Sequence, residues 1–68
     1  MIHKTAIIDP KAKISSNVSI GAYTIIGPNV KVGENSIIQS HVNIVGNTKI
    51  GINNKIYSFS SIVIDPLD

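Results

Sequence analysis

Two histidines, four carboxylates and a set of serines are the residues of this chain that could take part in acid–base or nucleophilic chemistry. The histidines are His3 and His41, and the carboxylates are Asp9, Glu34, Asp65 and Asp68. A general base must lie within hydrogen-bond reach of the proton that it removes, and no two of these groups have a spacing that would bring them together. Two isolated histidines also fall short of the three or four ligands of a zinc site. From residues 1–68 we therefore predict no catalytic residue, no metal site and no cofactor.

The elements that would position these groups follow from a strict repeat, because every sixth residue from Ile2 to Ile62 is isoleucine or valine. A helix favours apolar residues at a period of 3.6 and a simple strand at a period of 2, so neither accounts for a period of six. A chain that turns a corner every six residues does. We predict a single all-β domain over residues 1–68, a parallel β-helix with triangular coils of 18 residues. The residues alone leave its handedness open, although parallel crossovers are usually right-handed.

The residues around each aliphatic position predict the inner wall and the corners. Two residues earlier the side chain is small or β-branched, with Asn54 as the exception, which suits a second inward column. Corner positions carry Gly21, Gly27, Gly33, Gly51, Asn17, Asn29, Asn35, Asn47 and Asn53. Glycine and asparagine tolerate positive φ, so we expect positive φ at these corners. Pro10 and Pro28 fall inside corners, where a fixed φ is compatible with a turn.

Residues 18 apart should stack, which sorts the outward side chains into columns. One face carries Lys13, Lys31 and Lys49, a second begins with Ile7 and Ile25, and a third carries Met1, Ser19, Ile37 and Lys55. The lysine column is either a solvated face or an attraction for an acidic partner. Ile7 and Ile25 indicate a subunit interface. One corner column is aromatic, with Thr5, Tyr23, His41 and Phe59, and its rings either cover the coil edge or pack against a neighbouring subunit.

Composition excludes several classes of function. The chain has no cysteine, so a disulfide framework or a thiolate metal site is excluded. No apolar run approaches the 18 residues of a membrane span, and the N-terminus lacks the apolar segment of an export signal, so we expect a cytoplasmic location. The net charge of +2 comes from dispersed lysines, which argues against a nucleic-acid partner.

Several segments resemble a known family. The opening Ile2-His3-Lys4-Thr5-Ala6-Ile7-Ile8, the run Ile20-Gly21-Ala22-Tyr23-Thr24-Ile25-Ile26-Gly27-Pro28, and the stretches Gln39-Ser40-His41-Val42, Thr48-Lys49-Ile50-Gly51 and Asn54-Lys55-Ile56-Tyr57 are similar to the start of the acyl-(acyl-carrier-protein)–UDP-N-acetylglucosamine O-acyltransferases. The order of these segments covers the whole chain. It is more specific than the hexapeptide repeat, which many transferases share.

The resemblance implies a left-handed parallel β-helix, a homotrimer with active sites between subunits, and transfer of a 3-hydroxyacyl group from acyl carrier protein to the 3-hydroxyl of UDP-N-acetylglucosamine. That reaction is the first step of lipid A synthesis. The family's histidine general base lies beyond residue 68, and His41 matches a non-catalytic position. We therefore expect this chain to be an N-terminal portion of such an enzyme and to be inactive by itself.

The last residues carry the only substrate-binding position that the resemblance transfers. The family has Gly, then Pro-Gln-Asp, where this chain has Val63, Pro66, Leu67 and Asp68. Asp68 is thus implied at the nucleotide-sugar site, whereas leucine at position 67 cannot form the hydrogen bonds of a glutamine amide. The alternatives are a fragment of another hexapeptide acyl- or acetyltransferase, or a non-catalytic solenoid that mediates oligomerisation. A hexapeptide carbonic anhydrase is less compatible, because its three histidine ligands have no counterpart.

Overall fold

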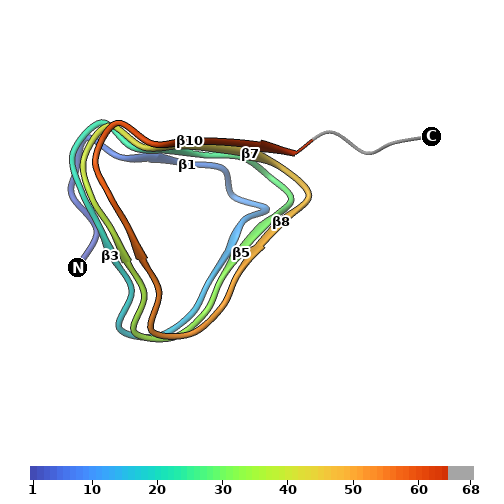
Figure 1. Ribbon diagram of the computed structural model, residues 1–68, viewed down its shortest axis with the longest axis horizontal. Coiled ribbons are helices and arrows are strands. Elements are labelled where there is room, and N and C mark those ends of the chain that lie inside the picture. The colour runs from blue at the N-terminus through green and yellow to red at the C-terminus, as the bar shows by residue number, and fades with distance from the viewer. Residues whose placement is uncertain (65–68) are drawn as a thin grey trace.

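The protein is a parallel β-helix of triangular cross-section, seen end-on in Figure 1. The computed structural model describes residues 1–64, and the side chains as far as Val63. Its strands are β1 (Ile7–Ile8), β2 (Lys13–Ile14), β3 (Ser19–Ile20), β4 (Ile25–Ile26), β5 (Val30–Val32), β6 (Ile37–Ile38), β7 (Asn43–Gly46), β8 (Thr48–Ile50), β9 (Lys55–Ile56) and β10 (Ser61–Ile64). They form three parallel sheets with the orders β1-β4-β7-β10, β2-β5-β8 and β3-β6-β9. The predicted fold class is confirmed.

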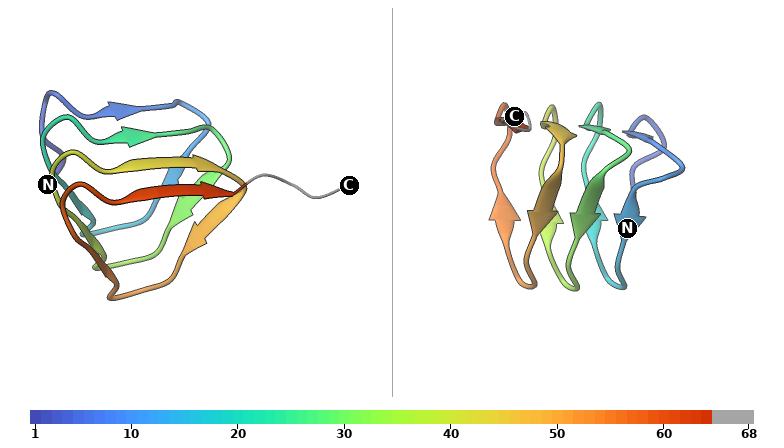
Figure 2. Two further views of the ribbon diagram at one scale, coloured as in Figure 1. Left: turned by 45° about the horizontal axis from the view of Figure 1, so that its top comes forward. Right: turned by 90° about the vertical axis from the view of Figure 1, so that its right-hand side faces the viewer.

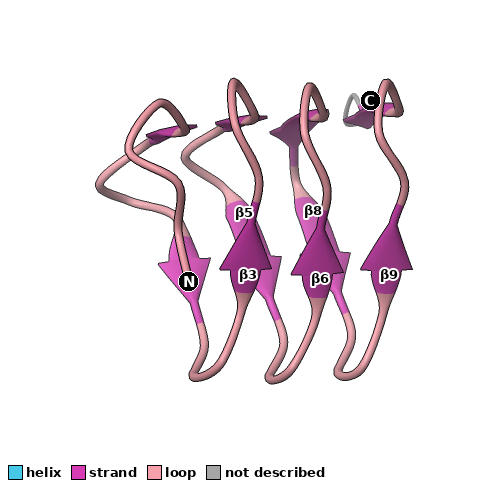
Figure 3. Cartoon of the chain, turned by 90° about the vertical axis from the view of Figure 1, so that its left-hand side faces the viewer, coloured by secondary structure: helices cyan, strands magenta, loops and turns pink. Residues whose placement is uncertain are grey.

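Each strand pairs with the strand one coil further along the chain, so the coils stack in register. Ile7 pairs with Ile25, Lys13 with Lys31, and Ser19 with Ile37, each 18 residues apart. The successive coils lie side by side along the solenoid axis (Figures 2 and 3). In Figure 1 the chain runs clockwise while later coils come towards the viewer, which makes the β-helix left-handed. The handedness implied by the resemblance is confirmed, against the general preference for right-handed crossovers.

The hexapeptide positions form the core, as predicted. Ile20, Ile26, Ile38 and Ile44 are at most 2% exposed, and the neighbouring inward column adds Val18, Val30 and Val42. Burial falls off at the two ends of the stack, where Ile8, Ile14, Ile56 and Ile62 are only partly buried and Ile2 is 47% exposed. An inward side chain is covered only if a coil lies on each side of it, so the middle coils carry most of the buried apolar surface.

The corners only partly match the prediction of positive φ. Asn17, Asn35 and Asn53 have φ between 55° and 62° as expected, but Asn29, Asn47 and the four corner glycines do not adopt positive φ. Instead Tyr23, His41 and Phe59 do, with φ between 58° and 64°, and Gly46 has φ 88°. The prediction was wrong for the glycines because two of the three corners are formed by a non-glycine residue in the left-handed region, two positions after the glycine.

Two of these glycines are required for close packing between coils. A Cβ at Gly33 would lie 2.7 Å from the carbonyl carbon of Gly51, and one at Gly21 would lie 2.7 Å from Ser40 N. Both obstacles are backbone of the next coil, which cannot move aside as a side chain can. At Gly27 the nearest atoms are 3.5 Å away, which is ordinary contact.

Buried hydroxyl groups connect neighbouring coils at the same two corners. Thr24 Oγ1 donates to Gln39 O at 2.7 Å and accepts from Val42 N at 3.3 Å. Ser36 Oγ donates to Gly51 O at 2.7 Å and accepts from Asn54 N at 3.2 Å. Both side chains are fully buried. Each hydroxyl therefore bonds two backbone groups of the next coil, one as donor and one as acceptor.

Candidate functional site

The one substrate-binding residue predicted from the sequence, Asp68, lies outside the described residues, as do Pro66 and Leu67. Within residues 1–64, no group of three or more His, Cys, Asp or Glu residues is placed to hold a metal ion. The described part of the chain also has no helix long and apolar enough to cross a bilayer. The remaining candidates for a functional surface are the histidines, the aromatic corner and the lysine face.

His3 lies in the first coil and is held by its own turn. Its Nδ1 accepts from Thr5 N at 3.2 Å and lies 2.8 Å from Thr5 Oγ1, which in turn accepts from Tyr23 N at 3.0 Å. Because Nδ1 serves as an acceptor, the neutral ring carries its proton on Nε2; this tautomer is assigned from the hydrogen bonds. The ring thus stabilises the first turn and its link to the second coil.

His41 is the central member of the aromatic corner, defined here as Tyr23, His41 and Phe59. Its ring centroid lies 5.4 Å from that of Tyr23, tilted by 35°, and 5.1 Å from that of Phe59, stacked at 19°. The predicted column of rings is confirmed. Tyr23 and Phe59 nevertheless remain 62% and 80% exposed. The two histidines occupy different columns, as expected, since His3 aligns with Gly21 and Gln39 rather than with His41.

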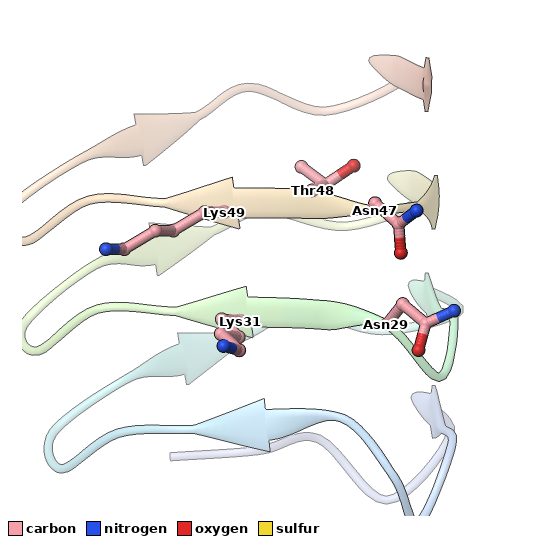
Figure 4. Close-up of a pocket in the computed structure, with 5 residues that line it drawn as sticks. All are labelled: Asn29, Lys31, Asn47, Thr48 and Lys49. Atoms are coloured by element: carbon pink, nitrogen blue, oxygen red, sulfur yellow. The ribbon is translucent and has the colours of Figure 1, made fainter. Parts of the chain in front are cut away.

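The lysine face, defined here as Lys13, Lys31 and Lys49, is formed by β2, β5 and β8. Register places Lys13 beside Lys31 and Lys31 beside Lys49, and all three side chains are exposed. An open groove of about 360 Å³ runs along this face, lined by Asn29, Lys31, Asn47, Thr48 and Lys49. Asn29 and Asn47 stack at its corner end, next to the two strands that carry the lysines (Figure 4). The groove offers ammonium and amide donors, a combination suited to anionic groups.

The other two faces are more apolar. On the sheet of β1 and β4, Ile7 and Ile25 pair in register and are 64% and 43% exposed, as the column analysis predicted. A second open groove, of about 570 Å³, lies on the sheet of β3 and β6 and is lined by residues that include Met1, His3, Ile37 and Ser40. His3 and Ser40 border the same groove, but no hydrogen bond joins them in the described residues.

Some of the contacts were not predicted from the sequence. Gln39 Oε1 accepts from Ser58 N at 3.0 Å and from Ser58 Oγ at 3.3 Å, linking two coils beside the aromatic corner. The Nζ of Lys55 lies 5.3 Å from the ring centroid of Tyr57, within cation–π range. The proximity of Asn29 and Asn47 to the lysines was predictable from the sequence, because these asparagines also recur at a spacing of 18.

Comparison with known proteins is consistent with this geometry. The family model described as bacterial transferase hexapeptide (six repeats) matches residues 1–33 and 11–46. The chain therefore belongs to the bacterial transferase hexapeptide family.

The similar proteins are UDP-N-acetylglucosamine acyltransferases. A Neisseria meningitidis acyl-(acyl-carrier-protein)–UDP-N-acetylglucosamine O-acyltransferase is 60% identical over 25 residues, which is 37% of this chain and 10% of the relative. The solved acyltransferase from Acinetobacter baumannii is 54% identical, with a TM-score of 0.88, over 90% of this chain and 24% of that one. The UDP-N-acetylglucosamine acyltransferase of Francisella novicida is 46% identical, with a TM-score of 0.90, over 100% of this chain and 25% of that one. This chain thus spans about a quarter of the length of the solved relatives that it matches.

Proposed function

We propose that residues 1–68 form coils of an O-acyltransferase that transfers a 3-hydroxyacyl group from acyl carrier protein to the 3-hydroxyl of UDP-N-acetylglucosamine. The observation that supports this most strongly is the match to the Francisella novicida enzyme, at 46% identity and a TM-score of 0.90 over 100% of the chain. Coil geometry alone would be shared by many hexapeptide proteins. Identity at this level over the whole chain favours the same activity.

The proposal assigns the chemistry mostly to residues outside this chain. The general base is a histidine that the family resemblance places beyond residue 68, and neither His3 nor His41 takes that role. His3 is engaged with Thr5, and His41 is stacked between two rings. The 68-residue chain by itself is thus expected to show no turnover.

Asp68 is the residue through which we propose that this chain contacts the nucleotide sugar. A carboxylate is a suitable acceptor for sugar hydroxyls and for the N–H of a base. The functional form is proposed to be a cytoplasmic homotrimer, with UDP-N-acetylglucosamine and acyl carrier protein as its partners. The exposed Ile7 and Ile25 offer an apolar surface for contact between subunits.

A chimera tests the proposal. Residues 1–68 would replace the matching coils of the Francisella novicida enzyme, and transfer from 3-hydroxyacyl carrier protein to UDP-N-acetylglucosamine would be measured on the purified trimer. We expect turnover within about tenfold of the parent enzyme, because the two backbones coincide. A folded, trimeric chimera without turnover would contradict the proposal.

Two matched variants in the chimera test the role of the last residues. Asp68→Ala should raise KM for UDP-N-acetylglucosamine about tenfold or more, as expected for a lost charge-assisted hydrogen bond. Leu67→Gln should lower KM, because the new amide can bond the nucleotide. As a control, the same coils from a hexapeptide transferase of different substrate should give no turnover; if they did, retention of activity would not be diagnostic.

A further inference from the structure

The corner amides of the later coils donate hydrogen bonds back to the preceding coil. His41 N donates to Ala22 O at 2.9 Å, and Thr48 N donates to Asn29 O at 3.3 Å. A first coil with the same corners would leave the equivalent amides without these partners. Such unpaired backbone groups at the edge of a sheet are a template for association with another chain.

The head of the solenoid, defined here as residues 1–14, satisfies these two amides within its own coil. Thr5 and Ala12 occupy the equivalent positions, 36 residues earlier in the chain. Thr5 N donates to His3 Nδ1 at 3.2 Å, and Ala12 N donates to Asp9 O at 2.9 Å. The Asp9 carboxylate also accepts from Lys11 N at 2.9 Å, which closes the same corner. The head is therefore closed at two of its corners against the addition of another coil.

The tail of the solenoid, defined here as β9 and β10, is open in comparison. One coil earlier, backbone N–H groups donate along the axis to the coil that follows, as in the bonds from Ile37 N to Asn54 O at 2.8 Å, from Gln39 N to Ile56 O at 2.9 Å and from Asn43 N to Ser60 O at 3.1 Å. Eighteen residues later, the register directs the N–H groups of Lys55, Tyr57 and Ser61 out of the tail. In residues 1–64 no further strand lies beyond β9 or β10 to accept these bonds.

The inward side chains of the tail are also less covered than those one coil earlier. Ile38 and Ile44 are 1% and 0% exposed, whereas Ile56 and Ile62, in the same two columns, are only partly buried. A further coil in the same register would cover both isoleucines as the tail itself covers Ile38 and Ile44. The tail thus combines unpaired backbone donors with apolar surface, the two components of a coil–coil contact in a solenoid.

We propose that the tail binds, in trans, one coil of a second hexapeptide polypeptide, in the 18-residue register that joins the coils of this chain. The interface continues the contacts that already exist between β7 and β10 and between β6 and β9. β9 and β10 belong to different sheets, on different sides of the triangle (Figures 1 and 3). A straight peptide strand can add to only one of these edges. A triangular coil adds to both at once and also covers the inward isoleucines.

The chemistry of the two ends selects the partner. A second copy of this chain would have to present its head, whose corners at Thr5 and Ala12 are closed by their own residues. The solved Acinetobacter and Francisella relatives use only 24% and 25% of their length to match this chain, so proteins of this kind have ample chain for a further coil. The inference goes beyond the acyltransferase proposal and does not depend on it, because the coil geometry is common to the hexapeptide family.

The experiment co-expresses the full 68-residue chain with a tagged Francisella novicida enzyme that lacks the matching coils. We expect the two polypeptides to co-purify as a complex with equal copies of each. Amide hydrogen exchange at Lys55, Tyr57 and Ser61 should slow at least tenfold in the complex, and exchange at Ile8 and Ile14, at the head, should change less than about twofold. The first coils of the Francisella enzyme, supplied as a separate chain, are the positive control. Absence of a complex, with this chain alone or with both chains, would overturn the proposal, as would slowing at the head without slowing at the tail.

Two variants at one position separate docking from folding. Ser61→Pro removes an N–H that points out of the tail, at a place where an edge strand tolerates proline. It should raise Kd for the partner at least tenfold while it changes the Tm of the chain by less than about 3 °C. Ser61→Ala keeps the N–H and should leave Kd within about twofold. By contrast, Asn43→Pro removes the equivalent N–H one coil earlier, whose bond to Ser60 O lies inside the chain, and should lower Tm markedly. Equal binding by Ser61→Pro and Ser61→Ala would contradict docking at the tail.

Two further outcomes distinguish this inference from its alternatives. Head-to-tail stacking of copies produces open filaments, so filaments of the chain alone that Ser61→Pro abolishes would show that a second copy occupies the tail and would contradict the assignment. If the chimera turns over but no complex forms in trans, docking at the tail is wrong and the acyltransferase proposal stands. If the complex forms and the chimera is inert, docking at the tail is supported and the acyltransferase proposal fails.

Discussion

Two corners of the triangle have the same backbone conformation but very different side chains. At the asparagine corner, Asn17, Asn35 and Asn53 have φ of 60°, 62° and 55°, and at the aromatic corner, Tyr23, His41 and Phe59 have φ of 59°, 58° and 64°. Asparagine enters the left-handed region readily, whereas for most other residues this region costs about 1–2 kcal/mol. The comparison shows that the fold requires the conformation but leaves the choice of side chain open.

Both left-handed corners carry the same supporting contacts. A glycine two residues earlier lets the next coil approach closely, at Gly33 on one side and Gly21 on the other. A buried hydroxyl one residue after the corner bridges two coils, Ser36 on one side and Thr24 on the other. At the third corner, within residues 1–64, Gly27 makes only ordinary contacts and the Thr48 hydroxyl bonds locally to Val45 O, so this corner serves as an internal control.

The largest expected effect is at the glycines. Gly33→Ala should lower the free energy of unfolding by about 3 kcal/mol, because the new Cβ would meet the backbone of Gly51 at 2.7 Å. Gly27→Ala, at the third corner, should be neutral or should stabilise by a few tenths of a kcal/mol, because a new Cβ there makes only ordinary contacts, the nearest at 3.5 Å, and alanine restricts the unfolded chain. Urea unfolding of the two variants under the same conditions measures the difference. Equal loss of stability at both positions would refute the distinction between the corners.

The hydroxyl bridge should have the next largest effect. Thr24→Val keeps the shape of a fully buried side chain but leaves Gln39 O and Val42 N without a partner, which should cost about 2 kcal/mol. The matched control is Thr48→Val at the third corner, where, within residues 1–64, Oγ1 makes one hydrogen bond, a local one of 3.3 Å to Val45 O. Its cost should be about 1 kcal/mol or less. Urea unfolding measures both, and a larger loss for the control would show that the bridge between coils is not special.

Some of these features were predictable and others were not, for identifiable reasons. The period of six and the spacing of 18 follow from Ile and Val at every sixth position, so the sheets and the lysine face could be predicted. The left-handed conformation of the aromatic corner could not be predicted, because neither tyrosine nor phenylalanine has an intrinsic preference for that region. Thr24 and Ser36 were recognised only as small side chains, because alanine and valine occupy the same column elsewhere.

The candidate site was less predictable than the fold for a different reason. The register of 18 places Lys13, Lys31 and Lys49 side by side, and this needed only the repeat. The partner that a face binds depends on groups that lie outside these coils. The hexapeptide repeat carries no information about those groups. Asp68 rests on a short resemblance and lies outside the described residues, so its role remains a prediction.

The smallest expected effect concerns the rings themselves and is also the most direct comparison of the two corners. Asn35→His places a histidine at the asparagine corner and should cost about 0.5 kcal/mol, since histidine enters the left-handed region more readily than most residues. His41→Asn lowers the cost of the left-handed backbone conformation but removes two ring contacts, whose centroid distances are 5.4 and 5.1 Å. Ring pairs contribute about 0.5–1.5 kcal/mol each, and the exposed faces here favour the lower end. The net change in unfolding free energy should therefore be within about 1 kcal/mol.

A double-mutant cycle decides what the aromatic corner contributes. His41→Asn and Phe59→Asn, singly and together, should give a coupling energy of about 0.5 kcal/mol, because the two rings stack at 19° but Phe59 is 80% exposed. A coupling above about 2 kcal/mol would mean that the stack is needed for folding. With a small coupling, the rings occupy an unfavourable conformation without an equal gain in stability from one another. The reason for their presence would then lie in a contact that the single chain does not make, as a neighbouring subunit would provide.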